Sequence, residues 1–121
     1  MSDKQALKAA YKQDGHRFRA MGVYQIKNQA NGKVYLAASP NIDGTMGRDR
    51  TWLRMGNHLN KALQQEWKAY GPEAFAFEVL ELLTPTDEPR NYPEELALLL
   101  EVWLETLQPY DERGYMKPPR Q

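Results

Sequence analysis

The reactive side chains of this sequence leave few kinds of chemistry open. The chain has no cysteine and two histidines, which excludes a disulfide scaffold, thiolate metal ligands, a cysteine nucleophile and a histidine-rich metal site. It also lacks a glycine-rich phosphate loop, a zinc-ligand spacing and a recognisable serine, histidine and aspartate arrangement. Any bound metal would need carboxylates, and the acidic pairs Asp87-Glu88 and Glu94-Glu95 are more simply explained as solvated loop acids and acids at a helix start.

Charge is divided unevenly along the chain, although the net charge is zero. Residues 1–71 contain 12 Lys and Arg against 5 Asp and Glu, a net of +7. Residues 72–121 contain 4 Lys and Arg against 11 Asp and Glu, a net of −7. If the fold keeps the halves on different faces, the first half offers a positive surface to a polyanion such as nucleic acid. If the halves pack together, their charges neutralise each other.

Length and composition indicate one soluble globular domain. A chain of 121 residues with 41% hydrophobic and 26% charged residues has the usual make-up of a single compact domain. No apolar run approaches the roughly 18 residues that suggest a membrane span. The first residues are charged and lack the apolar stretch of a signal peptide. We therefore expect a cytoplasmic protein without membrane association.

The dipeptide Asn31-Gly32 predicts a β-hairpin in the first half of the chain. Segments 22–28 and 33–37, on either side of it, are rich in β-branched and aromatic residues. Because the connection is short, the two strands should pair antiparallel. Before the hairpin, Ser2 and Gln5 form a capping-box pattern that predicts a short helix over 3–13.

The remaining periodicity predicts three more helices and one more strand. Helical spacing and stop signals predict helices over 46–55, 58–70 and 94–107, and alternation predicts a strand over 74–82. The residues between these elements, 38–44 and 84–93, have loop composition. The last helix is apolar around most of its surface and should be buried against the sheet. The order of elements indicates an α+β fold.

Two tripeptides in the hairpin resemble the motif that names the GIY-YIG nuclease family. Gly22-Val23-Tyr24 is followed, after ten residues, by Tyr35-Leu36-Ala37. The segments QIKNQANGKVY, GNHLNKALQQEWKAYG, FAFEVLE and LQPYDERGY are similar to the family's hairpin, next helix, third strand and final segment. The resemblance implies a small three-stranded antiparallel sheet flanked by helices. It divides the chain into an N-terminal helix and linker (1–20), a GIY-YIG-like domain (21–116) and a disordered tail (117–121).

The resemblance also implies a DNA phosphodiester as substrate. Hydrolysis of that bond needs a base for water, a positive charge on the phosphate and usually a metal ion at the leaving oxygen. In the family pattern, Tyr24 would be the base, Tyr35 the second tyrosine, Arg48 the helix arginine and His58 a family histidine. Glu101 would be the ligand of Mg²⁺ or Mn²⁺, which we expect to bind weakly.

Three positions near the hairpin depart from the family pattern. The second tripeptide ends in Ala37 where the family has glycine. The usual arginine position is Thr45, and Arg48, about one helical turn further on, is the favoured substitute. Asp49 stands where a family histidine is often found, and it would place a negative charge toward a polyanionic substrate.

Two positions near the C-terminus depart as well. The metal-binding glutamate usually lies three residues before the tryptophan, here Trp103, and that position is Leu100. Glu101 is its neighbour, but one residue is a rotation of about 100° on an α-helix. Met116 replaces a common asparagine. Together these changes are typical of relaxed catalysis.

Cations near the tyrosines have two expected roles. A tyrosine base needs a lowered pKa, because a free phenol titrates at about pH 10, and Lys33, Arg48 and Arg50 are the candidates for lowering it. With Arg54 and Lys61, the same residues would form a surface that faces DNA phosphates. The alternative for either tyrosine is simple cross-strand packing.

Three functions therefore remain open. The favoured interpretation is a nuclease-fold protein that binds DNA with weak or lost phosphodiester hydrolysis. The second is an active metal-dependent endonuclease that uses Tyr24, Arg48 and Glu101. The third is a protein-interaction module in which the old cleft and the acidic face contact a partner protein.

Overall fold

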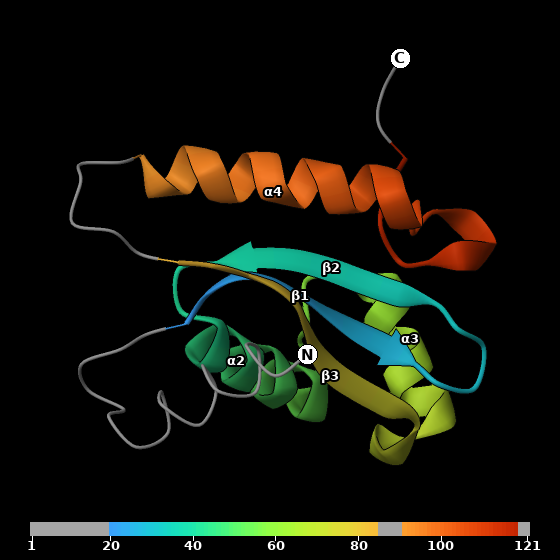
Figure 1. The fold of residues 1–121 in the computed structure, drawn as a ribbon. Coiled ribbons are helices and arrows are strands. Elements are labelled where there is room, and N and C mark those ends of the chain that lie inside the picture. Colours follow the sequence, from blue (N-terminus) through green and yellow to red (C-terminus); the bar gives the residue numbers. More distant parts are fainter. Residues whose placement is uncertain (1–19, 85–90, 119–121) are drawn as a thin grey trace.

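The architecture is a three-stranded antiparallel sheet with helices on both sides (Figure 1). The computed structural model describes residues 20–84 and 91–118. The helix expected over 3–13 lies outside the described residues. Those residues form β1 (Met21–Asn28), β2 (Val34–Ser39), α2 (Ile42–Met55), α3 (Lys61–Tyr70), the short 3₁₀ helix η1 (Pro72–Ala74), β3 (Phe75–Leu83), α4 (Tyr92–Leu107) and η2 (Asp111–Arg113). The predicted α+β class is confirmed.

β1 is the central strand because both other strands pair with it, in the order β2-β1-β3. The Asn31-Gly32 turn closes the hairpin: the Gly32 amide donates to the Asn28 carbonyl at 2.7 Å, and Gly32 has a φ of 81°. Glycine adopts that conformation without strain. Tyr24 lies opposite Ala37 of β2 and Val79 of β3. The predicted hairpin and third strand are both confirmed.

The two faces of the sheet have different roles. Tyr24 and Ile26 of β1 belong to the main hydrophobic core, which α2 and α3 close with Leu53, Leu63 and Trp67. Successive residues of a strand point to opposite faces. Gln25 and Lys27 therefore point to the other face, where α4 packs against β1 and β2. Figure 1 shows α4 on the side away from α2 and α3.

Asparagine caps begin the three longer helices of the described residues. The Asn41 side chain accepts from the Gly44 amide, that of Asn60 from the Leu63 amide and that of Asn91 from the Glu94 amide. The Asn41 cap begins α2 at Ile42, so residues 42–44, which were predicted as loop, belong to the helix. Asn60 starts α3 three residues later than predicted. Side-chain caps of this type satisfy amides that the first helical turn leaves without partners.

Some apolar residues of the predicted helices are exposed. Leu59 lies within the helix predicted over 58–70, but it precedes α3 and is 80% exposed. α4 packs against the sheet as predicted, but the apolar residues around its surface are not all covered, since Leu98 and Val102 are each 56% exposed. Only one side of α4 therefore packs on the sheet.

Among the described residues, no helix is long and apolar enough to cross a membrane.

Glu66 joins α3 to the hairpin and to the C-terminal segment. Its Oε1 accepts from Asn28 Nδ2 at 3.1 Å, Asn31 Nδ2 at 2.9 Å and the Tyr115 hydroxyl at 2.5 Å, and its Oε2 lies 3.2 Å from Lys33 Nζ. Burial favours a raised pKa for this carboxyl, but these hydrogen bonds outweigh burial and lower the pKa of Glu66. The charged carboxylate is therefore the stable form in the fold.

The pair Leu63 and Leu59 tests the core assignment. Leu63→Ala removes a fully buried side chain from the core beneath α3 and should lower the free energy of unfolding by about 2–5 kcal/mol. Leu59→Ala is the matched control at an exposed position and should change it by less than about 0.5 kcal/mol. Urea denaturation measures both, and equal effects would contradict the assignment.

Candidate functional site

Three polar side chains meet in the core between the sheet and α2. The Tyr24 hydroxyl donates to Asp49 Oδ2, and His58 Nε2 lies 3.0 Å from Asp49 Oδ1. All three side chains are buried, and Asp49 is only 1% exposed. A charged carboxylate in such a place requires hydrogen-bond donors on both oxygens. Tyr24 and His58 supply them.

The surroundings of His58 set which ring nitrogen carries the proton. The Asn60 amide donates to His58 Nδ1 at 3.0 Å, so Nδ1 must be an acceptor. The proton is therefore on Nε2, which donates to Asp49. Gln64 fixes the His58 backbone: its Oε1 accepts from the His58 amide and its Nε2 donates to the Leu53 carbonyl. Both nitrogens of the imidazole are consequently engaged within the protein.

Aromatic rings and one arginine form the rim of this cluster. The Tyr35 ring meets the His58 ring edge-on at 5.4 Å between centroids, and the Trp52 ring does so at 6.2 Å. The Arg48 guanidinium lies over Trp52, 4.6 Å from the ring centroid, and its Nη2 is 3.8 Å from Asp49 Oδ1. The structure thus brings together the four residues predicted as catalytic, Tyr24, Tyr35, Arg48 and His58. They surround Asp49, for which the sequence had suggested only an unfavourable charge.

Both tyrosines retain their protons at neutral pH. Burial raises the pKa of Tyr24 far above its usual value, and the hydrogen bond to Asp49 and the charge of Asp49 raise it further. Burial and Asp49 raise the pKa of Tyr35 as well. Arg48 acts in the opposite direction but is outweighed.

The expectation that cations lower the pKa of Tyr24 was therefore wrong. Of the three candidates, Arg48 is opposed by burial and by Asp49. Lys33 is paired with Glu66. The Arg50 guanidinium lies over the Phe77 ring, 4.3 Å from its centroid.

The donor set does not fit a divalent metal ion. Mg²⁺ and Mn²⁺ require several oxygen ligands, and no group of three His, Asp or Glu side chains within residues 20–84 and 91–118 could hold one. Asp49 uses both oxygens inside the protein. Leu100 has no ligand atom, and Glu101 is exposed on α4. Thr45, at the usual arginine position, instead shares a 2.5 Å hydrogen bond with Ser39.

The predicted phosphate-facing residues divide into two groups. Arg48, Arg54 and Lys61 are exposed on α2 and α3, whereas Lys33 and Arg50 are partly buried against Glu66 and Phe77. α4, on the other side of the sheet, carries four glutamates and no basic residue. The exposed cations of α2 and α3 and the glutamates of α4 therefore belong to helices on opposite sides of the sheet (Figure 1).

Two solved structures share this architecture. The catalytic domain of the homing endonuclease I-TevI has a TM-score of 0.65 and 25% identity, over 78% of this chain and 95% of that chain. A mutant of the same domain, with one glutamate replaced by alanine, has a TM-score of 0.67 and 25% identity, over 80% of this chain and 92% of that chain. The chain has the GIY-YIG nuclease fold. No protein-family model and no curated protein matches the sequence.

The GIY-YIG fold places both tripeptide tyrosines in the interior cluster. Tyr24 is fully buried and Tyr35 is partly buried, with its ring against His58. Reasoning from sequence underestimated the role of Asp49. The sequence shows an acid at a position where the family often has histidine. It does not show that Asp49 is buried, because the burial depends on the packing of α2 against β1.

Asp49→Asn tests whether the carboxylate holds the proton on Tyr24. The amide has no charge and only one acceptor oxygen, so the pKa of Tyr24 should fall, and the free energy of unfolding should drop by about 1–3 kcal/mol. ¹³C NMR of labelled tyrosine measures the titration over the pH range in which the protein stays folded. Asp43→Asn, an exposed change in the first turn of α2, is the control. Identical titration of Tyr24 in all three proteins would contradict the assignment.

Proposed function

We propose that this GIY-YIG-fold protein binds DNA through the side that carries α2 and α3, and that it hydrolyses phosphodiesters weakly or not at all. One observation supports the loss of hydrolysis above all others. Asp49 is buried between Tyr24 and His58 and accepts a hydrogen bond from each.

This arrangement removes the groups that hydrolysis needs. A general base must be within hydrogen-bond reach of water and able to take its proton. Tyr24 is protonated and donates to Asp49, and His58 has both nitrogens engaged with Asp49 and Asn60. The carboxylate of Asp49 also repels an approaching phosphate. In this proposal, Tyr24 and Tyr35 therefore contribute to the packing of the core and take no part in catalysis.

The charge distribution supports DNA as the ligand. Arg48, Arg54 and Lys61 are exposed and carry positive charge on α2 and at the start of α3. Most contacts between proteins and DNA backbones are made by such cations and are independent of sequence. The structural similarity to the catalytic domain of an endonuclease, which extends over 95% of that domain, also supports DNA as the ligand.

A second candidate function rests on the outer side of α4. Leu98 and Val102, four residues apart on one side of the helix, are exposed among the acids Glu94, Glu101 and Glu105. An apolar stripe with an acidic border fits a basic and apolar protein surface. If DNA binding fails, this surface makes a protein-interaction module the next interpretation.

Salt dependence tests DNA binding. Binding to a DNA duplex should weaken as salt rises, and Arg48→Ala and Lys61→Ala should each weaken it and reduce the slope of log affinity against log salt by about 0.9. Lys27→Ala removes the same charge from the opposite face and is the control. Fluorescence anisotropy measures all four proteins. Salt-independent binding, absence of binding at low salt, or an equal effect of Lys27→Ala would contradict the proposal.

Cleavage assays test the loss of hydrolysis. The natural chain should show little or no cleavage of duplex, nicked or branched DNA with Mg²⁺ or Mn²⁺. The triple variant Thr45→Arg, Asp49→His and Leu100→Glu restores the family's residue types and should gain activity if the cleft is otherwise intact. Strong cleavage by the natural chain that is lost in Glu101→Ala would establish the endonuclease instead. A folded triple variant that binds DNA without cutting it would show that the cleft has changed further.

A further inference from the structure

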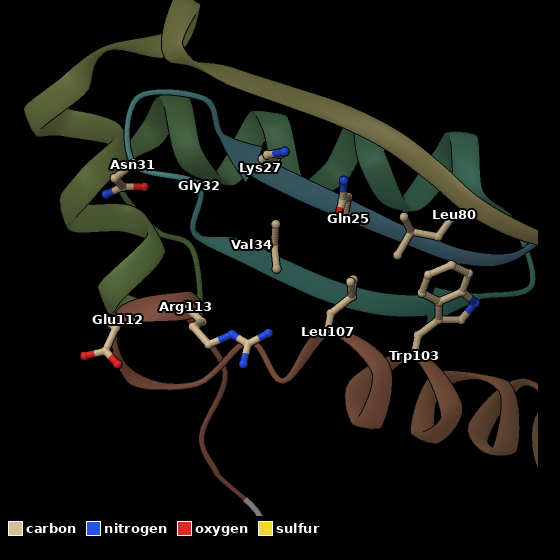
Figure 2. A pocket seen from close by; sticks show the side chains of 10 residues that line it. All are labelled: Gln25, Lys27, Asn31, Gly32, Val34, Leu80, Trp103, Leu107, Glu112 and Arg113. Atoms are coloured by element: carbon tan, nitrogen blue, oxygen red, sulfur yellow. The ribbon is translucent and has the colours of Figure 1, made fainter.

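A cavity of about 410 Å³ lies on the face of the sheet opposite Tyr24. It opens between the hairpin of β1 and β2 on one side and the end of α4 with η2 on the other (Figure 2). Small-molecule sites usually measure roughly 300–1,000 Å³. The cavity is therefore large enough for a small organic ligand, and it is separate from the Tyr24, Asp49 and His58 cluster.

One part of the cavity lining is apolar and fixed in position. Val34, Leu80, Trp103 and Leu107 line it from β2, β3 and α4. The Trp103 indole donates its N–H to Glu81 Oε1 at 2.8 Å, which holds the ring in one orientation. A flat apolar ligand would find an aromatic surface here that is already ordered.

Two cations, Lys27 and Arg113, also line the cavity, and neither forms an ion pair with any described residue. The other lining residues are Gln25, Asn31, Gly32 and Glu112. The nearby acids do not pair with these cations. Glu78 accepts from Gln25, Glu81 accepts from Trp103, and Glu112, which also lines the cavity (Figure 2), forms no ion pair with Lys27 or Arg113. The Arg113 guanidinium points between Val34 and Leu107 in the same view. An anion in the cavity would therefore meet two positive charges that lack carboxylate partners.

The backbone around Arg113 is held against the sheet. The Tyr115 amide donates to the Val34 carbonyl at 3.0 Å, and the Met116 amide donates to the Pro109 carbonyl at 3.0 Å. Gly114 makes this turn possible, because a Cβ there would lie 2.3 Å from the Pro109 carbonyl oxygen. The guanidinium is thus supported by a tightly packed segment.

We propose that this cavity binds a small aromatic carboxylate, with its ring against Trp103 and its carboxylate at Arg113 and Lys27. A guanidinium matches a carboxylate through two parallel N–H donors. The apolar residues account for the ring, and the two unpaired cations account for the charge. The site is independent of DNA binding and uses none of the residues of the Tyr24 cluster.

Three naphthalene probes test the proposal: 1-naphthoate, the neutral 1-naphthalenemethanol and the cationic 1-naphthylmethylammonium. NMR follows the indole N–H signal of Trp103, assigned with the variant Trp103→Phe. Only the anion should shift this signal with measurable affinity. The double variant Lys27→Gln and Arg113→Gln should weaken its binding about tenfold.

A matched variant separates a local site from a general charge effect. Arg54→Gln with Lys68→Gln removes two positive charges from exposed positions on α2 and α3 and should leave naphthoate binding unchanged. Equal binding of the three probes, no shift of the Trp103 signal, or equal weakening in both double variants would overturn the proposal. Circular dichroism confirms that each variant is folded before the comparison.

Discussion

The rest of this structure depends on the buried carboxylate of Asp49. Removing a charge from water is costly unless donors surround it, and here the donors are the Tyr24 hydroxyl and His58 Nε2. The Asn60 amide supports this arrangement, because it donates to His58 Nδ1 and so leaves the ring proton on Nε2, which faces Asp49. Asn60 in turn caps α3 and donates its side-chain amide to the Tyr115 carbonyl. One carboxylate thereby connects β1, α2, the start of α3 and the C-terminal segment.

The same interaction is the basis of the proposed loss of hydrolysis in a chain that keeps the nuclease fold. The GIY-YIG architecture keeps Tyr24, Tyr35, Arg48 and His58 within one cluster, as it would for catalysis. Asp49 at its centre converts the tyrosine and the histidine into donors for an internal anion. Arg54 and Lys61 are exposed outside this cluster, so attraction of a polyanion does not depend on hydrolysis.

Local patterns explain why the sequence predicted the fold well. Asn31-Gly32 specifies a hairpin through backbone conformation alone, and alternation specifies β3, so both were found. The starts of α2 and α3 were missed, although Asn41 and Asn60 are typical caps. The hydrogen bonds of Glu66 could not be predicted, because its partners Asn28, Lys33 and Tyr115 are 33 to 49 residues distant in sequence. The burial of Asp49 likewise depends on tertiary packing, whereas Leu100 and Thr45 could be identified from spacing.

The most direct test of the account is ¹⁵N NMR of the His58 imidazole in the unmodified protein. The hydrogen bonds of His58 predict the tautomer with its proton on Nε2, a hydrogen-bonded Nδ1, and slow exchange of the Nε2 proton with water because the ring is buried. A proton on Nδ1, or a ring that exchanges rapidly with solvent, would contradict it. Either result would mean that Asp49 is not held by His58 and that the cluster is open to water.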